Sequence, residues 1–364
     1  MSVSEAALTS ALATVLDPHT GQPYTAGRQL KNLRVGADGA VAFDVELGYP
    51  ARSQFPVVRD ALAAAAKSVT GVGAVEIAVS SKIVAHQVQR GVALLPGVAN
   101  VIAVSSGKGG VGKSTTAVNL ALALSAEGAR VGLLDADIYG PSLPLMMGIE
   151  GRPESEDGKT MKPMENHGVQ VMSIGFLVDP EQAVVWRGPM ATQALDQLLR
   201  QTSWRELDYL IIDMPPGTGD IQLTLSQRVP LTGAVIVTTP QDIALLDAKK
   251  GLNMFEKVGV PILGIVENMA VHVCTNCGHV EHIFGADGGK RMAGQYNVPY
   301  LGALPLTLAI REQTDSGTPT VVAEPDGEIA ALYKAVARQV AVVVAAKAKD
   351  FSAKFPSINI SKST

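Results

Sequence analysis

One segment constrains the fold of this chain more than any other, the string Gly107-Lys-Gly-Gly-Val-Gly-Lys-Ser-Thr115. Residues 101–106 before it are mostly apolar and have the pattern of a short buried strand, and residues 115–126 after it are rich in Ala and Leu with helical periodicity. Strand, glycine-rich loop and helix therefore follow in the order of a phosphate-binding loop. In such a loop successive backbone N–H groups point at a polyphosphate, and the helix N-terminus adds partial positive charge.

The string predicts a nucleoside triphosphate site. Lys113 is expected to contact the β- and γ-phosphates, and the Ser114 hydroxyl is expected to bind Mg²⁺. An ordinary glycine-rich turn is the alternative, which the full set of matched positions disfavours. The expected nucleotide-binding residues of the loop are Gly107, Lys108, Gly109, Gly110, Val111, Gly112, Lys113, Ser114 and Thr115.

A second lysine, Lys108, lies near the start of the loop. A cation so close to Lys113 is costly without a negative partner. The string resembles the deviant Walker A motif of the MinD/ParA/nitrogenase iron protein group of P-loop ATPases. That resemblance implies a dimer in which Lys108 reaches across the interface to the partner's nucleotide, and a solvated loop lysine is the alternative.

Acidic residues follow two of the expected strands. Asp135 and Asp137 come after residues 129–134, and Asp213 ends residues 209–213 just before a Pro-Pro-Gly turn that finishes at Gly217. Mg²⁺ and the attacking water are managed at the carboxyl ends of strands beside a phosphate loop. We therefore expect Asp213 to hold Mg²⁺ through water, and the Gly217 N–H to sense the γ-phosphate.

The resemblance to the same group implies roles for three more residues. The counterpart of Asp137 helps to activate water, that of Asp135 supports the metal-side network, and an asparagine placed like Asn268 reads the edge of the base. A turn-forming asparagine is the alternative for Asn268. Because phosphoryl transfer needs positioning and charge neutralisation more than covalent help, the candidate catalytic residues are Lys108, Lys113, Asp137 and Asp213.

The sequence predicts an α/β protein: a P-loop NTPase with a mostly parallel sheet flanked by helices, preceded by a small α/β domain. We expect the small domain at residues 1–95, the ATPase domain at 98–346 and a loose polar tail at 347–364. The strands expected in the ATPase domain are residues 101–106, 129–134, 209–213, 234–239, 262–267 and 300–304.

The small domain resembles the domain of iron–sulfur assembly accessory proteins, in its β/α arrangement and in its Asp17-Pro18 pair. The reactive cysteine that this family carries beside a proline is missing, because Tyr49-Pro-Ala-Arg-Ser-Gln-Phe-Pro56 occupies that loop. A thiol role for this domain is therefore excluded.

The composition excludes several classes of protein. The net charge is −4, whereas nucleic-acid binding requires a basic face. No apolar run reaches the roughly 18 residues of a membrane helix, and the N-terminus lacks the pattern of an export signal. Two cysteines cannot form a disulfide scaffold. We expect a cytoplasmic protein with neither a nucleic-acid nor a membrane partner.

The two cysteines of the chain are Cys274 and Cys277, and three histidines lie close by, His272, His279 and His282. Three interpretations compete. A redox pair normally opens a helix, whereas this segment has the pattern of a metal knuckle. A zinc site could use both cysteines and two histidines of one chain. An iron–sulfur cluster usually needs four thiolates, so two chains would have to meet.

Several strings resemble the Mrp/ApbC family of iron–sulfur carrier ATPases over nearly all of residues 98–345. They are the phosphate loop, Asp135-Ala-Asp-Ile-Tyr-Gly-Pro-Ser142, Asp213-Met-Pro-Pro-Gly-Thr-Gly-Asp220, Glu267-Asn-Met269 and the paired cysteines. The resemblance implies a homodimer that binds ATP, Mg²⁺ and, through Cys274 and Cys277, a [4Fe–4S] cluster at its interface. It further implies ATP-linked delivery of the cluster to apo-proteins, together with assembly factors. A zinc-stabilised regulatory ATPase and a MinD/ParA-like positioning ATPase are the alternatives.

Overall fold

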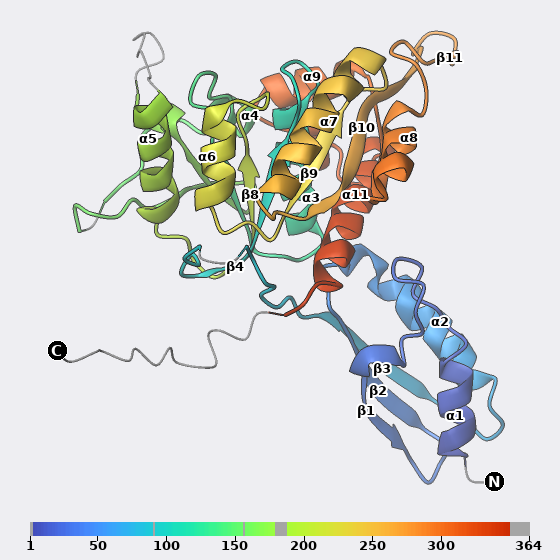
Figure 1. The fold of residues 1–364 in the computed structure, drawn as a ribbon. Helices are drawn as coiled ribbons and strands as arrows, with labels where there is room; N and C mark the ends of the chain where they lie inside the picture. The colour runs from blue at the N-terminus through green and yellow to red at the C-terminus, as the bar shows by residue number, and fades with distance from the viewer. Residues whose placement is uncertain (1–2, 90–91, 156, 179–187, 350–364) are drawn as a thin grey trace.

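The computed structural model describes residues 3–89, 92–155, 157–178 and 188–349. Its strands form two separate sheets, a three-stranded one near the N-terminus and a nine-stranded one in the rest of the described chain. The N-terminal unit lies beside the C-terminal end of the last helix, which is red in Figure 1. The predicted fold class is confirmed.

The N-terminal unit packs two helices on one small sheet. In it β2 pairs antiparallel with β1 and parallel with β3. The side chains of β2 alternate between buried and half-buried, as expected for a strand with one covered face. The elements are α1 (Glu5–Leu12), β1 (Leu30–Val35), β2 (Val41–Leu47), α2 (Phe55–Lys67) and β3 (Val75–Ser81).

The large sheet has the order β11-β10-β9-β4-β8-β5-β7-β6, with β12 also paired to β10. Its central pairs are parallel, and only β6 and β11 run antiparallel to their neighbours. The strands are β4 (Val98–Ser105), β5 (Val131–Asp135), β6 (Met164–Asn166), β7 (Val169–Ser173), β8 (Leu207–Asp213), β9 (Gly233–Thr238), β10 (Ile262–Val273), β11 (Val280–Glu281) and β12 (Tyr300–Pro305).

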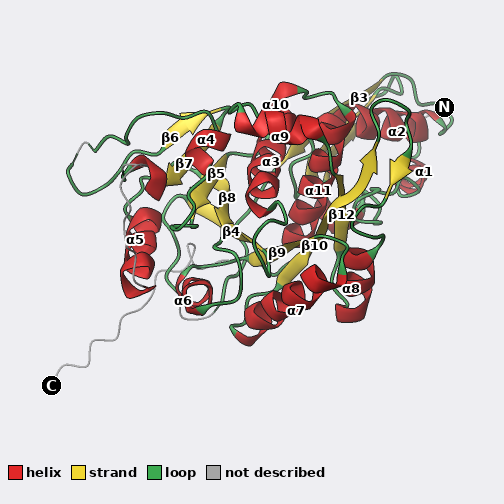
Figure 2. Cartoon of the chain, turned by 90° about the horizontal axis from the view of Figure 1, so that it is seen from above, coloured by secondary structure: helices red, strands yellow, loops and turns green. Residues whose placement is uncertain are grey.

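Helices cover both faces of this sheet, as Figure 2 shows from above. The first face carries α3 (Lys113–Ala126), α4 (Leu143–Met146), α9 (Leu308–Asp315), α10 (Thr320–Ala323) and α11 (Glu328–Ala345). The opposite face carries α5 (Gly188–Arg200), α6 (Asp220–Arg228), α7 (Asp242–Lys257) and α8 (Gly288–Tyr296). In the described residues no helix has the length and apolarity needed to cross a bilayer.

Two features of the large sheet differ from the sequence prediction. The short strands β6 and β7 at one edge were not predicted at all. The strand predicted at residues 262–267 is longer in the structure, where β10 continues to Val273. Pairing with β12 and β11 stabilises that extension. Of the predicted tail, residues 350–364 lie outside the described part, whereas Lys349 forms an isolated bridge with His86.

The side chain of Glu127, at the end of α3, joins the two units. Glu127 is 1% exposed, and its carboxylate accepts hydrogen bonds from the Ser53 N–H at 2.9 Å and the Ser53 hydroxyl at 2.7 Å. Arg338 of α11 forms an ion pair with the same carboxylate at 2.5 Å. The helix that begins at the phosphate loop therefore ends on the N-terminal unit.

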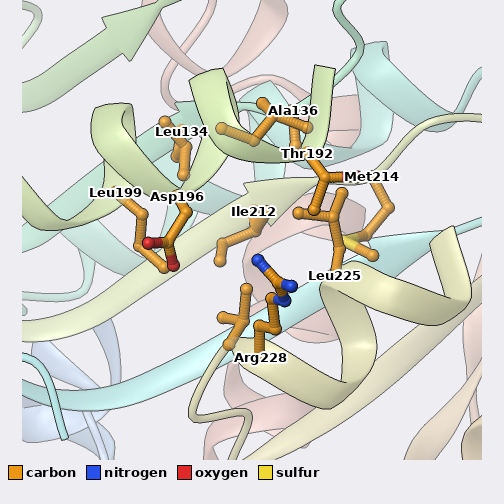
Figure 3. A pocket seen from close by; sticks show the side chains of 11 residues that line it. Leu134, Ala136, Thr192, Asp196, Leu199, Ile212, Met214, Leu225 and Arg228 are labelled. Carbon is orange, nitrogen blue, oxygen red and sulfur yellow. The ribbon is translucent and has the colours of Figure 1, made fainter. Parts of the chain in front are cut away.

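A small gap lies under α5 and α6, where Arg228 points between the two helices (Figure 3). Its volume is about 10 Å³, which is room for about one water molecule. It is therefore a packing gap and not a substrate site.

Candidate functional site

The phosphate loop connects β4 to α3, and two of its glycines have no room for a side chain. Gly112, directly before α3, has a left-handed φ of 78°, and a Cβ there would lie 2.1 Å from the Asn268 amide nitrogen. A Cβ on Gly107 would lie 2.0 Å from the Asp247 carbonyl carbon of α7. Close packing thus requires glycine at both positions, and the backbone conformation favours it at Gly112 as well.

Lys113 is buried, and its ammonium group binds a carboxylate. Its Nζ donates to Asp213 Oδ1 at 2.5 Å and to Ser114 Oγ at 3.2 Å. Lys113 is 6% exposed and Asp213 is 0% exposed. The structure therefore brings together the phosphate-binding lysine, the hydroxyl and the aspartate that the sequence assigns to the Mg²⁺ site.

A second carboxylate, Asp135, lies beside Asp213. The two residues are register partners at the ends of β5 and β8. Burial, followed by the negative charge of Asp213, raises the pKa of Asp135 to about 7. The N–H groups of Leu143 and Asp137 and the hydroxyl of Ser173 oppose this shift. The Ser142 N–H also donates to the Asp135 carboxylate. Two buried carboxylates this close together favour the binding of a cation between or beside them.

Asp137 follows two residues later and is half-buried. Burial raises the pKa of its carboxyl group, while the nearby charge of Lys113 opposes that increase. Asp137 therefore lies within electrostatic reach of Lys113. Its assignment as the residue that activates water stays a prediction.

Ser106 connects two further predicted residues, Lys108 and Gly217. Its hydroxyl donates to the Lys108 carbonyl at 2.9 Å, and its own carbonyl accepts from the Gly217 N–H at 3.0 Å. Sensing of a γ-phosphate by Gly217 would require that this second bond break. Among the described residues no carboxylate lies within ion-pair distance of Lys108.

A pocket of about 520 Å³ opens beside the phosphate loop, a volume typical of small-molecule sites. Gly112 and Thr115 line it on one side, and Asn268, Met269 and His272 of β10 line it on another. The Asn268 amide donates to the Val111 carbonyl at 2.8 Å. Asn268 therefore contacts the loop backbone, and its predicted contact with a base stays a prediction.

The cysteine pair lies at the end of an arm formed by β10 and β11. The Gly278 N–H donates to the Cys274 carbonyl at 2.8 Å, and the Cys274 N–H donates to the His279 carbonyl at 2.9 Å. The two thiols form no disulfide, Cys274 is partly exposed and Cys277 is exposed. The N–H groups of Cys277 and Asn276 lower the pKa of the Cys274 thiol, which favours the metal-binding thiolate.

Two of the three neighbouring histidines form hydrogen bonds with backbone carbonyls. His272 Nδ1 hydrogen-bonds the Leu306 carbonyl at 2.9 Å, and His282 Nδ1 hydrogen-bonds the Ala270 carbonyl at 2.8 Å. No three side chains of His, Cys, Asp or Glu come together as a metal site within the described ranges. Within the described residues, one copy of the chain thus offers two thiols as metal ligands and no third ligand beside them.

Comparison with known proteins agrees with this geometry. Residues 97–341 match the family described as NUBPL iron-transfer P-loop NTPase. The chain belongs to this family. Residues 5–79 match a second family, described as iron–sulfur cluster assembly protein. Both resemblances expected from the sequence are confirmed.

Several members of known sequence or structure are similar to this NTPase. An iron–sulfur cluster carrier protein of Escherichia coli K12 is 54% identical over 84% of this chain and 83% of its own length. The iron–sulfur cluster transfer protein NUBPL of Mus musculus is 54% identical over 68% of this chain and 78% of its own length. A solved nucleotide-binding protein of Archaeoglobus fulgidus, in complex with ADP, is 37% identical, with a TM-score of 0.56 over 64% of this chain and 90% of that one.

Three residues of this family member were not predicted from the sequence. Ser173 binds Asp135, but it ends a strand that was missed. Met269 has a left-handed backbone, with φ of 55°, which a sequence reveals only at glycine. Glu127 follows an Ala/Leu-rich helix and has the pattern of a solvated helix end.

Proposed function

We propose that this chain is an ATP-dependent iron–sulfur cluster carrier. The single observation that carries the proposal is the position of Cys274 and Cys277. They are the two cysteines of the chain, they form no disulfide and Cys277 is exposed, and they follow the strand that also lines the pocket beside the phosphate loop. Family membership and the names of the similar proteins support the same function.

ATP binds with its phosphates on the loop and its base in the adjoining pocket. Lys113 moves from Asp213 to the β- and γ-phosphates, which releases Asp213 to hold Mg²⁺ through water, together with the Ser114 hydroxyl. Asp135 supports the metal side. For hydrolysis, Asp137 activates the attacking water, and Lys113 and Lys108 neutralise the negative charge of the phosphates. The buried ion pair between Lys113 and Asp213 supports this exchange of partners.

A [4Fe–4S] cluster is the cargo, and it is held between two copies of the chain. Four thiolates complete such a cluster, and each copy supplies Cys274 and Cys277. A two-fold axis near the arms brings the four sulfurs together in an isologous interface. In the same dimer Lys108, which has no carboxylate partner in the described structure, reaches the nucleotide of the second copy.

The two alternative functions have less support. A zinc site within one chain would use Cys274, Cys277, His279 and His282, but no three such side chains come together as a metal site in the described residues. A positioning ATPase would need a basic surface or a membrane segment, and the net charge of −4 argues against the first. The partners we propose are therefore apo iron–sulfur proteins and assembly factors.

A transfer assay tests this function. The chain is reconstituted anaerobically, separated from free iron, and mixed with an apo-protein that becomes active only with a [4Fe–4S] cluster. We expect activation that depends on Cys274 and Cys277 and that changes when Mg-ATP is added. Asp137→Ala should load and bind ATP normally but lose the part of the response that requires hydrolysis. Activation by a Cys274→Ala protein at the native rate would contradict the proposal.

A further inference from the structure

A single strand connects the nucleotide pocket to the cysteine pair. Asn268, Met269 and His272 lie on β10 and line the pocket, and Cys274 follows directly after the strand. From His272 to Cys274 the chain advances only about 7 Å, at roughly 3.3 Å per strand residue. A ligand in the pocket would therefore lie against the base of the cysteine arm.

Asn268 fixes this strand to the phosphate loop. Its side-chain amide donates to the Val111 carbonyl at 2.8 Å, and the pair is buried. The amide also lies where a side chain on Gly112 would be, directly before α3. Any adjustment of the loop around phosphates is thus transmitted to Asn268 through a buried hydrogen bond and through direct contact.

Met269, the next residue, is a point of irregular backbone within β10. Its φ of 55° is left-handed, a conformation that is unfavourable for a residue other than glycine. The pairing of β10 with β12 shifts register between Glu267 and Val271, so the irregularity is centred here. Beyond it the arm is fixed again, because Leu306 donates to the Val271 carbonyl at 2.8 Å. Of the irregularities in this strand, the one at Met269 lies between the loop contact and the arm.

We propose that Asn268 and Met269 form a hinge that sets the position of the cysteine arm according to the occupancy of the nucleotide pocket. Asn268 acts through the backbone of the phosphate loop as a positioning residue. Met269 lies between Asn268 and the arm, and its kinked backbone sets the direction of the arm relative to Asn268. This inference rests on the proposed function, and it names the route by which ATP acts on the cluster site.

Thiol alkylation tests the hinge on the metal-free full chain. The alkylation rate of Cys274 and Cys277 is measured with and without Mg-ATP. We expect the native rates to differ by about fivefold or more, the lower end of typical couplings between sites. Met269→Gly also removes a side chain that lines the pocket, so each protein is alkylated at a saturating concentration of Mg-ATP. The two rates of this variant should be nearly equal, because a glycine backbone is free at this position and no longer fixes the direction of the arm. A native-like ratio in Met269→Gly would overturn the hinge.

Asn297→Gly is the matched control. Asn297 is also left-handed, with φ of 52°, but it ends α8 and does not line the pocket. Removing its strain should leave the nucleotide response of the thiols unchanged. Loss of the response in both variants would mean that general loosening, and not the hinge, is responsible, and would also overturn the proposal.

A second measurement separates loop positioning from base reading at Asn268. Affinities for ATP and for inorganic tripolyphosphate, which has no base, are compared in native chain and Asn268→Ala. Positioning predicts that both affinities fall by a similar factor. A fall for ATP alone would show that Asn268 only reads the base and would overturn its role in the hinge.

The proposed function and the hinge fail in different ways. A native chain that binds neither ATP nor iron would remove the function itself. A native chain that binds both, and transfers its cluster, but shows equal alkylation rates with and without Mg-ATP would refute the hinge alone.

Discussion

Replacing Lys113 by methionine should destabilise the ATPase domain even when no nucleotide is added. Lys113 is the cation beside two buried carboxylates, Asp213 at 2.5 Å and its register partner Asp135. Methionine keeps most of the side-chain volume but leaves both carboxylates without a positive neighbour. Removing one partner of a buried ion pair costs about 3–5 kcal/mol. At roughly 2–4 °C per kcal/mol for a domain of this size, the melting temperature should fall by about 10 °C.

Tryptophan fluorescence is a suitable assay for this unfolding. The two tryptophans, Trp186 and Trp204, both lie in the sequence of the predicted ATPase domain, so the N-terminal unit does not contribute to the signal. Thermal unfolding is followed at pH 8 in the native chain, in Lys113→Met, in Asp213→Asn and in the double variant. Because the two side chains contact each other, the double variant should lose less stability than the two single losses together.

The loss should also depend on pH. Burial and the charge of Asp213 raise the pKa of Asp135 to about 7, so the folded chain binds a proton more readily than the unfolded chain does. The penalty for burying an ionised Asp135 is therefore complete above that pKa, decreases as the pH falls below it, and vanishes only near the ordinary carboxyl pKa of 3.8. Lys113→Met should melt closer to the native chain at pH 5.5 than at pH 8. An equal loss at both pH values, or no loss at pH 8, would refute this account of the ion pair.

Two further variants test other parts of the site. Asp137→Ala should bind Mg-ATP with near-native affinity but hydrolyse it at least about 100-fold more slowly, because a positioned base contributes about 10²–10⁴ in rate. Calorimetry measures the affinity, and phosphate release measures the hydrolysis rate. An unchanged hydrolysis rate would remove Asp137 from the mechanism. Glu127→Ala should leave Arg338 unpaired and loosen the junction between the two units. The melting temperature should fall, and proteolysis between the units should become faster. Glu206→Ala is the control: it removes only an exposed ion pair with Arg130, so it should change neither the melting temperature nor the proteolysis rate.

The core of the site could be predicted from the sequence because its signals are local. The phosphate loop, the strand-end aspartates and the cysteine pair are each contained within a few consecutive residues, and the periodicity of the flanking strands and helices places them at one edge of a parallel sheet. The structure adds the pairing of β5 with β8, which brings Asp135 next to Asp213 and which no local pattern predicts.

The remaining features depend on contacts between distant parts of the chain. β10 continues through the polar residues Glu267 and Asn268 because β12 and β11 pair with it, and no local pattern indicates this. Glu127 binds Ser53, 74 residues before it, and Arg338, 211 residues after it. Such contacts are a consequence of the tertiary fold, and they appear only when the structure is known.

The central claim is that two copies of the chain hold one cluster through Cys274 and Cys277. Its most direct test is to count iron and sulfide per chain after anaerobic reconstitution, with the mass of the protein in solution measured on the same sample. We predict about four iron and four sulfide for every two chains, a dimer by mass, near-complete loss of iron in Cys274→Ser, and native iron content in His279→Ala. A monomer that carries the full complement, or a Cys274→Ser protein that retains its iron, would contradict the claim.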